Sequence, residues 1–199
     1  MTDVQICNYA LLQIGDTEGI SSMTENTKAS KVCARVYEIE RETLLSEFPW
    51  NFVIKQALLV KVTDETSQEF NFVYEYPGDC LRVLKIFTGS ETDGMVNDYK
   101  IIYTKDANDN IKRIVCNLDD AYIEYIMDMQ DENADSAIFS KLLAYRIAAE
   151  IAVPLTGDAR IAQSARQGYA ETLAKAKYLT ALERQQPINK GNRYMTARR

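Results

Sequence analysis

Residues 121–157 read AYIEYIMDMQDENADSAIFSKLLAYRIAAEIAVPLTG, and the pattern of apolar residues changes within this stretch. Its first nine residues are rich in β-branched and aromatic side chains, which is typical of a strand. After Asp135 the apolar residues follow helical spacing until Gly157, a typical helix end. Pro154 is expected to disturb the last turn of this helix. The stretch therefore predicts a strand followed by a helix.

The segments between Asn51 and Met129 are short, rich in β-branched and aromatic residues, and separated by turn-like sequences such as DETSQ, PGD, GSETDG and DANDN. This pattern predicts a small, mostly antiparallel sheet. The predicted strands are FVIKQALLVKV, EFNFVYEY, CLRVLKIF, DYKIIYT, NIKRIVC and AYIEYIMDM.

Two helices are predicted before this sheet and one after residue 157. The first covers about 3–14, and the second runs to Phe48-Pro49 after a candidate capping box of Ser22 and Glu25. The last begins after Asp158 and reaches about Gln186. It carries a stripe of mostly small residues, through which another helix, such as one of a neighbouring subunit, could approach closely: Ala162, Ala165, Tyr169, Leu173 and Ala176.

The predicted fold class is therefore α+β. A four-helix body is expected from residues 1–50 and 130–186, with a β-rich insertion at 51–129 between the second and third helices. Residues 187–199 follow Pro187 and are expected to form an extended C-terminal arm. With 199 residues, of which 46% are hydrophobic, the chain can bury a sizeable core.

Several kinds of chemistry have no support in the composition. The chain has no histidine, which removes Ser-His-Asp and Cys-His catalysis and histidine-bound zinc. No GxGxxG or GxxxxGK[ST] sequence is present, and the four cysteines are scattered, as expected for buried thiols in a reducing compartment. We therefore expect no cofactor, metal or catalytic residue. The sequence also predicts no membrane span and no export signal, as expected for a soluble protein.

Charge is distributed unevenly along the chain. Residues 1–157 contain 14 basic and 26 acidic residues, a net −12, whereas residues 158–199 contain 9 basic and 3 acidic residues, a net +6. After Pro187 there is no acidic residue, and four cations alternate with isolated apolar residues. Because the interleaving of aromatic and basic residues expected of a single-strand binder is absent from 158–186, this basic end favours an acidic protein surface over nucleic acid.

A set of residues along most of the chain resembles the head-to-tail adaptor family of short-tailed bacteriophages, which includes the tail accessory factors and tail tubular protein A. The resemblance begins with NYALLQIG at 8–15. It ends with AYIEYIMDM, LLAYRIAAEIAVPLTGD and the long helix that follows. Between them it rests on Ala29, Cys33, Tyr37, Arg41, Leu44, Leu45 and the PWNF sequence at 49–52.

The resemblance implies a structural virion protein without enzymatic activity. Such a protein would form a ring, of twelve subunits by resemblance, that joins the portal to the tail and continues the DNA channel. Its expected partners are the portal protein, a tail nozzle or tail tube protein, identical subunits, and genomic DNA passing without sequence-specific binding. It would be assembled in the host cytoplasm and reside at the head-to-tail junction of the virion. The expected portal-binding residues are Pro187, Ile188, Lys190, Arg193, Tyr194, Met195, Arg198 and Arg199.

Two alternatives remain open at this point. The first is a carboxylate-based hydrolase of cell wall or polysaccharide carried in the phage tail. Glu124 and Asp128 lie about 13 Å apart along a strand, beyond the spacing of about 5–10 Å that glycoside hydrolysis needs. Asp119 or Glu75 would have to supply a partner carboxylate. The second alternative is a small DNA-packaging or DNA-binding factor, which the basic C-terminal end suggests.

Overall fold

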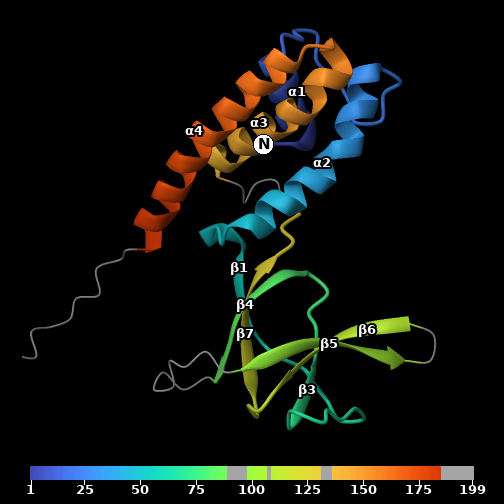
Figure 1. The fold of residues 1–199 in the computed structure, drawn as a ribbon, viewed down its shortest axis with the longest axis vertical. Coiled ribbons are helices and arrows are strands. Elements are labelled where there is room, and N and C mark those ends of the chain that lie inside the picture. The colour runs from blue at the N-terminus through green and yellow to red at the C-terminus, as the bar shows by residue number, and fades with distance from the viewer. Residues whose placement is uncertain (89–97, 107–108, 131–135, 185–199) are drawn as a thin grey trace, which may run out of the picture.

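A computed structural model of the chain describes residues 1–88, 98–106, 109–130 and 136–184. Within these residues, four helices gather at one end of an elongated molecule and seven strands at the other (Figure 1). The predicted α+β class is confirmed, with the strands inserted between the second and third helices. The helices are α1 (Asp3–Gln13), α2 (Lys28–Glu47), α3 (Ala137–Thr156) and α4 (Ala159–Arg184).

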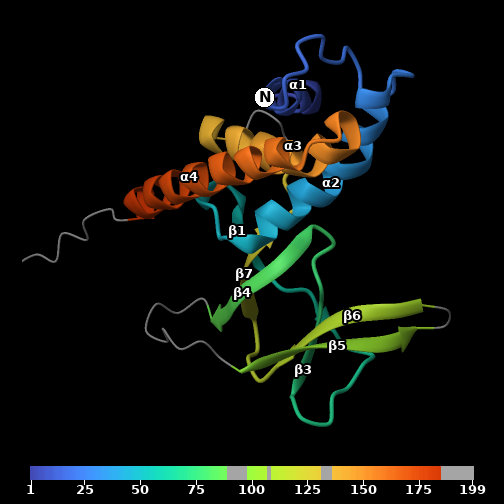
Figure 2. The same cartoon turned by 45° about the horizontal axis from the view of Figure 1, so that its top comes forward.

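The helical body is built around α3, which contacts α1, α2 and α4 (Figure 2). Ten of its residues are buried, so it forms the centre of the body core. Ser136 caps its first turn, and Gly157 ends it with a left-handed backbone of φ 74°, as predicted. The helix continues through Pro154 to Thr156, so this proline does not end it.

The small residues of α4 face α3 of the same chain. Ala162, Ala165 and Ala176 are buried in the body core, and Gly168 lies against the ring of Tyr145 on α3. The absence of large side chains lets the two helix backbones approach closely. The prediction that another helix approaches this stripe closely is confirmed, and that helix is α3 of the same chain, which covers the alanines.

Helix α2 begins differently from the prediction. Its N-cap is Thr27, whose side chain accepts a hydrogen bond from the Ser30 amide, rather than Ser22. The carboxylate of Glu25 instead accepts hydrogen bonds from Ser21 and Thr27 in the preceding loop. The end of α2 matches the prediction, because the chain leaves the helix at Phe48.

Trp50 is a core residue. It is 2% exposed, lies edge-to-face with Phe48 and Phe139, and its indole Nε1 donates to the Leu44 carbonyl at 2.9 Å. The four cysteines are free thiols. Three of them are buried, and Cys80 is half-buried.

The strands form two antiparallel sheets rather than the single sheet that was predicted. After the 3₁₀ turn η1 (Asn51–Val53), the first sheet has the order β1-β7-β4 and the second β2-β3-β6-β5. They pack face to face around a second core. The strands are β1 (Ile54–Leu58), β2 (Lys61–Val62), β3 (Phe72–Glu75), β4 (Cys80–Thr88), β5 (Tyr99–Asp106), β6 (Asp109–Cys116) and β7 (Ala121–Met127).

The body and the insertion are joined by a buried arginine of α2. Arg41 is 6% exposed, lies 2.8 Å from the carboxylate of Asp128, and donates at 2.8 Å to the carbonyl of Met129. Glu38 accepts two further hydrogen bonds from the same guanidinium. Ile126, the second-last residue of β7, is buried in the helical core. The first sheet is therefore anchored to the body at this end.

Candidate docking face on the first sheet

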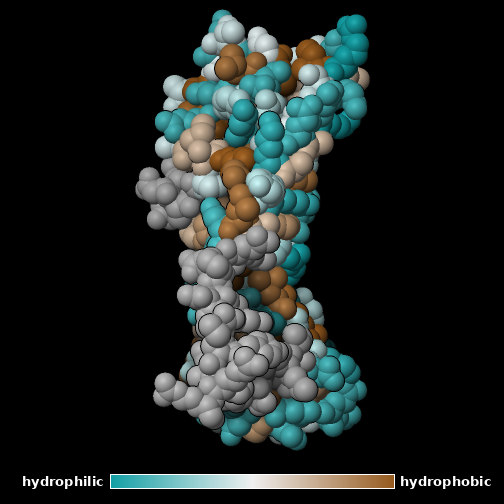
Figure 3. Space-filling model, turned by 90° about the vertical axis from the view of Figure 1, so that its left-hand side faces the viewer, coloured by the Kyte–Doolittle hydropathy of each residue, from teal (hydrophilic) through white to brown (hydrophobic). Residues whose placement is uncertain are grey.

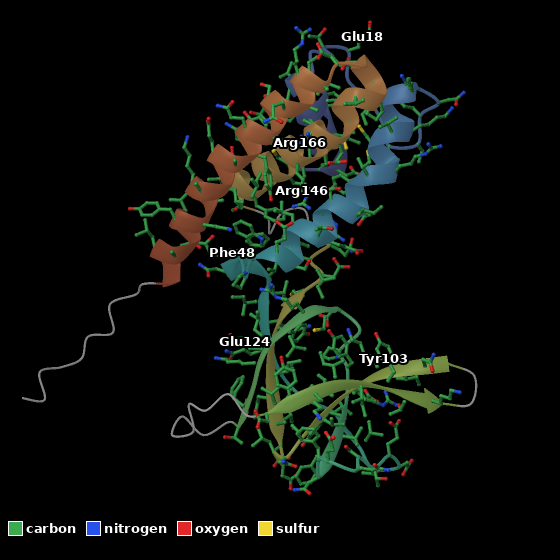
Figure 4. The ribbon with its side chains drawn as sticks, in the orientation of Figure 1. Glu18, Phe48, Tyr103, Glu124, Arg146 and Arg166 are labelled. Atoms are coloured by element: carbon green, nitrogen blue, oxygen red, sulfur yellow. The ribbon has the colours of Figure 1, made fainter. Side chains whose placement is uncertain are left out.

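The outer face of the β1-β7-β4 sheet is the most distinctive surface of the insertion. Side chains alternate along β7, so Ile123 and Tyr125 point into the core between the sheets, whereas Tyr122, Glu124 and Ile126 point the other way. At the upper end, Ile126 is buried in the core of the helical body, and Leu84 packs partly against that core. The rest of this outer face is not covered by any described element, and Glu124 points out from it (Figure 4).

The outer face carries two apolar rows separated by a polar row. Strand pairing places Gln56 and Lys85 on either side of Glu124, and these three residues form the polar row. It places Leu58 and Phe87 on either side of Tyr122, and these three form the lower apolar row. Ile54 and Leu84 form the upper apolar row, on the other side of the polar row. We name these eight residues the outer face: Ile54, Leu84, Gln56, Glu124, Lys85, Leu58, Tyr122 and Phe87.

The upper part of the outer face is hollowed into an open groove of about 620 Å³ beneath the end of α4. Asn51 connects the groove to α4, because its Nδ2 donates to the Thr180 carbonyl at 3.0 Å and to Glu183 Oε2 at 2.8 Å. The last described turn of α4 therefore lies at the groove rim. The groove is lined by Pro49, Asn51, Ile54, Gln56, Leu84 and Glu124.

Glu124 provides the negative charge of the outer face. Its Oε2 accepts a hydrogen bond from Gln56 Nε2 at 2.5 Å and lies 3.2 Å from Lys85 Nζ. Both contacts use the same oxygen, and no donor from the described part of the chain reaches Oε1. Lys85 pairs with this carboxylate, so the polar row carries one negative and one positive charge, and the Glu124 side chain is 18% exposed.

The lower row is apolar and accessible. The rings of Phe87 and Tyr122 stack with centroids 5.8 Å apart, and Leu58 is 54% exposed. Figure 3, which views the side to which Glu124 points, shows hydrophobic side chains on and just below the helical body, above the lower row. Large apolar side chains gathered on one open sheet face indicate a contact surface, since single exposed ones are common.

A second exposed apolar group lies at the end of α4. Tyr178, Leu179 and Leu182 are 64%, 44% and 47% exposed. Thr180, on the opposite side of the helix, is buried against the body. These apolar side chains come directly before the cation-rich C-terminal residues of the sequence.

Three of the four carboxylates considered for hydrolysis, Glu124, Asp128 and Asp119, each lie beside a cation. Asp128 is paired with Arg41, whereas Glu124 contacts Gln56 and Lys85. Asp119 lies 2.9 Å from Lys61 Nζ, and the hydrogen bond to this lysine lowers the pKa of Asp119. A general acid needs a raised pKa instead. These contacts give the hydrolase alternative no support.

All eight expected portal-binding residues lie outside the described part of the chain, which ends at Arg184. They are Pro187, Ile188, Lys190, Arg193, Tyr194, Met195, Arg198 and Arg199. The outer face was not predicted from the sequence. Its one local signal was the strand AYIEYIM, in which both alternating sets contain large apolar residues.

Comparison with known sequences does not assign the chain to a family. No protein-family model matches it, and no curated protein is significantly similar in sequence. No helix within the described residues has the length and apolar character required to cross a membrane. The fold and this face define an α+β protein in which a helical body carries a two-sheet insertion with one open, largely apolar face.

Proposed function

We propose that this protein is a head-to-tail adaptor of a short-tailed bacteriophage, a structural ring that joins the portal to the tail. The observation that carries the proposal is the place of the two-sheet insertion between α2 and α3. This is the arrangement that the sequence resemblance implies. The family resemblance itself rests mostly on residues of the body, such as Arg41, together with the PWNF sequence at 49–52 and the strand AYIEYIMDM.

The distribution of charge and apolar surface is consistent with such a role. The first 157 residues carry a net −12, and an acidic or neutral channel wall would let DNA phosphates slide without being held. The exposed apolar end of α4 leads into residues 187–199, which we propose as the portal-docking arm. In this proposal cations steer the arm to an acidic groove while Ile188, Tyr194 and Met195 fill apolar pockets.

The proposal is tested by mixing the purified protein with portal rings of short-tailed phages and following co-sedimentation. We expect the full chain to decorate the rings with rotational symmetry and a chain ending at residue 186 to fail. Replacing Tyr194 and Met195 by Ala should weaken binding at every ionic strength, by about 1–3 kcal/mol for each buried side chain. Replacing Arg193, Arg198 and Arg199 by Gln should slow association, mainly at low salt.

Different failures overturn different parts of the proposal. If the truncated chain decorates portals as well as the full chain, residues 187–199 are not the docking arm. If the full chain binds no portal but clears peptidoglycan, the hydrolase alternative replaces the adaptor. Salt-sensitive retention of DNA without portal binding would favour a DNA-binding factor.

A further inference from the structure

The second sheet is buried on both of its sides, although only one side lies against the first sheet. Tyr74, Ile114 and Cys116 belong to the core between the sheets. Val73 and Val115 point to the opposite side, yet they are only 3% and 1% exposed. Strand pairing places these two valines next to each other. Another part of the chain therefore covers this side of the second sheet.

The cover is the segment of residues 63–71 between β2 and β3, which we name the strap. Its Glu65 reaches Arg113 on β6, whose Nε and Nη2 both donate to Oε1 of the carboxylate, at 3.0 Å and 2.7 Å. The Glu65 and Arg113 side chains are 25% and 13% exposed, so this ion pair is largely shielded from solvent. The hydrogen bonds from Arg113 lower the pKa of Glu65, which keeps the carboxylate charged at neutral pH.

A second ion pair holds the other end of the strap. Glu69 pairs with Lys100 on β5, and Lys100 Nζ lies 5.8 Å from the centroid of the Phe70 ring. Strand pairing places Lys100 beside Val115, and Arg113 is two residues from Val115 on the same side of the sheet. Because the strap contacts both cations, it passes over Val115, which is next to each of them.

The strap is otherwise polar and loosely packed. Its one large apolar side chain, Phe70, is half-buried. Within the described residues, no backbone hydrogen bond joins 63–70 to another element, and the amide of Asn71 donates to Asn117 Oδ1 at 3.0 Å. An open pocket of about 460 Å³ remains between the strap and the strands β5 and β6. Charge therefore contributes more than apolar packing to the contact between the strap and the sheet.

We propose that the strap is a cover held by charge, which opens locally when its two carboxylates release Arg113 and Lys100. Opening exposes Val73 and Val115 together with these two cations. Neither valine belongs to the core between the sheets or to the core of the helical body, so both cores stay folded when the strap opens. The inference does not require the adaptor proposal, because it concerns contacts within one chain.

The test compares hydrogen exchange in the full chain and in its variants at neutral pH, measured by mass spectrometry. Glu65→Gln should raise the exchange rate of residues 63–71 about tenfold, because a neutral amide replaces the carboxylate that accepts two hydrogen bonds from Arg113. Exchange of residues 121–127 in β7 should stay unchanged. Glu69→Gln should raise exchange of the strap only about twofold, because its ion pair with Lys100 is exposed to solvent.

The matched control is Asp64→Asn, which removes the same charge from the neighbouring position in the strap. Asp64 is exposed and accepts a hydrogen bond from the Thr63 hydroxyl rather than from a cation, so this change should leave exchange unaltered. Equal acceleration in Asp64→Asn and Glu65→Gln would overturn the proposal, and so would unchanged exchange in Glu65→Gln. Acceleration that extends through β3, β6 and β7 would also overturn it, because the strap would then open only with the whole insertion.

Discussion

Gly168 should resist replacement by alanine, although alanine is the better helix former. In an exposed helix this change would stabilise the protein by about 1 kcal/mol. Here the added Cβ would lie 2.6 Å from Cε1 and 2.9 Å from Cδ1 of Tyr145. Carbon atoms prefer about 3.5–4.0 Å, and overpacking of this kind costs about 1–3 kcal/mol.

The Tyr145 ring cannot move away without loss of its other contacts. It lies edge-to-face with Tyr9 at 6.2 Å, with Lys141 Nζ 5.9 Å from its centroid. We therefore expect the overpacking cost to exceed the helix-propensity gain, so that Gly168→Ala lowers the free energy of unfolding by about 1 kcal/mol. Urea denaturation followed by circular dichroism measures this difference.

Removing the Tyr145 ring should reverse the sign of the effect of Gly168→Ala on the free energy of unfolding. In a Tyr145→Ala background, Gly168→Ala should stabilise the protein by about 1 kcal/mol, because only the helix-propensity gain remains. Ser164→Ala, an exposed change on α4, is the control and should be slightly stabilising. If Gly168→Ala stabilises the unmodified chain, α3 and α4 are not in the close contact described above.

Two further changes test the junction and the loop before α2. Arg41→Ala should lower the free energy of unfolding, measured by urea denaturation, by about 2–3 kcal/mol, because it leaves Asp128 and the Met129 carbonyl without their donor. Arg35→Ala, an exposed change on the same helix, is the control and should have little effect. Equal losses of stability in the two variants would refute the role of Arg41. Hydrogen bonds from Ser21 and Thr27 lower the pKa of Glu25 from 4.5 to about 2, so its contribution to stability is complete above about pH 4.5 and is lost as the pH falls toward 2. Glu25→Gln should therefore reduce the loss of stability between pH 5 and pH 2, measured from urea midpoints, and an unchanged pH profile would contradict the assignment.

The sequence by itself determined the features that depend on neighbouring residues. Apolar spacing located all four helices, and the left-handed conformation at Gly157 followed from its lack of a Cβ. Short β-rich segments separated by turn residues located the strands within 51–129. The N-cap of α2 was missed, because Ser22 and Thr27 are both plausible caps and only the actual start of the helix distinguishes them.

Only the tertiary structure decided how these elements meet. The small residues of α4 looked free in the sequence, but α3 covers them, and Arg41 meets Asp128 across 87 positions of sequence. Division of the strands into two sheets left Leu58, Tyr122 and Phe87 on an open face. Periodicity shows that a strand or helix has an apolar side. Which surface covers that side depends on long-range packing, and for residues far apart in the chain no local pattern contains this information.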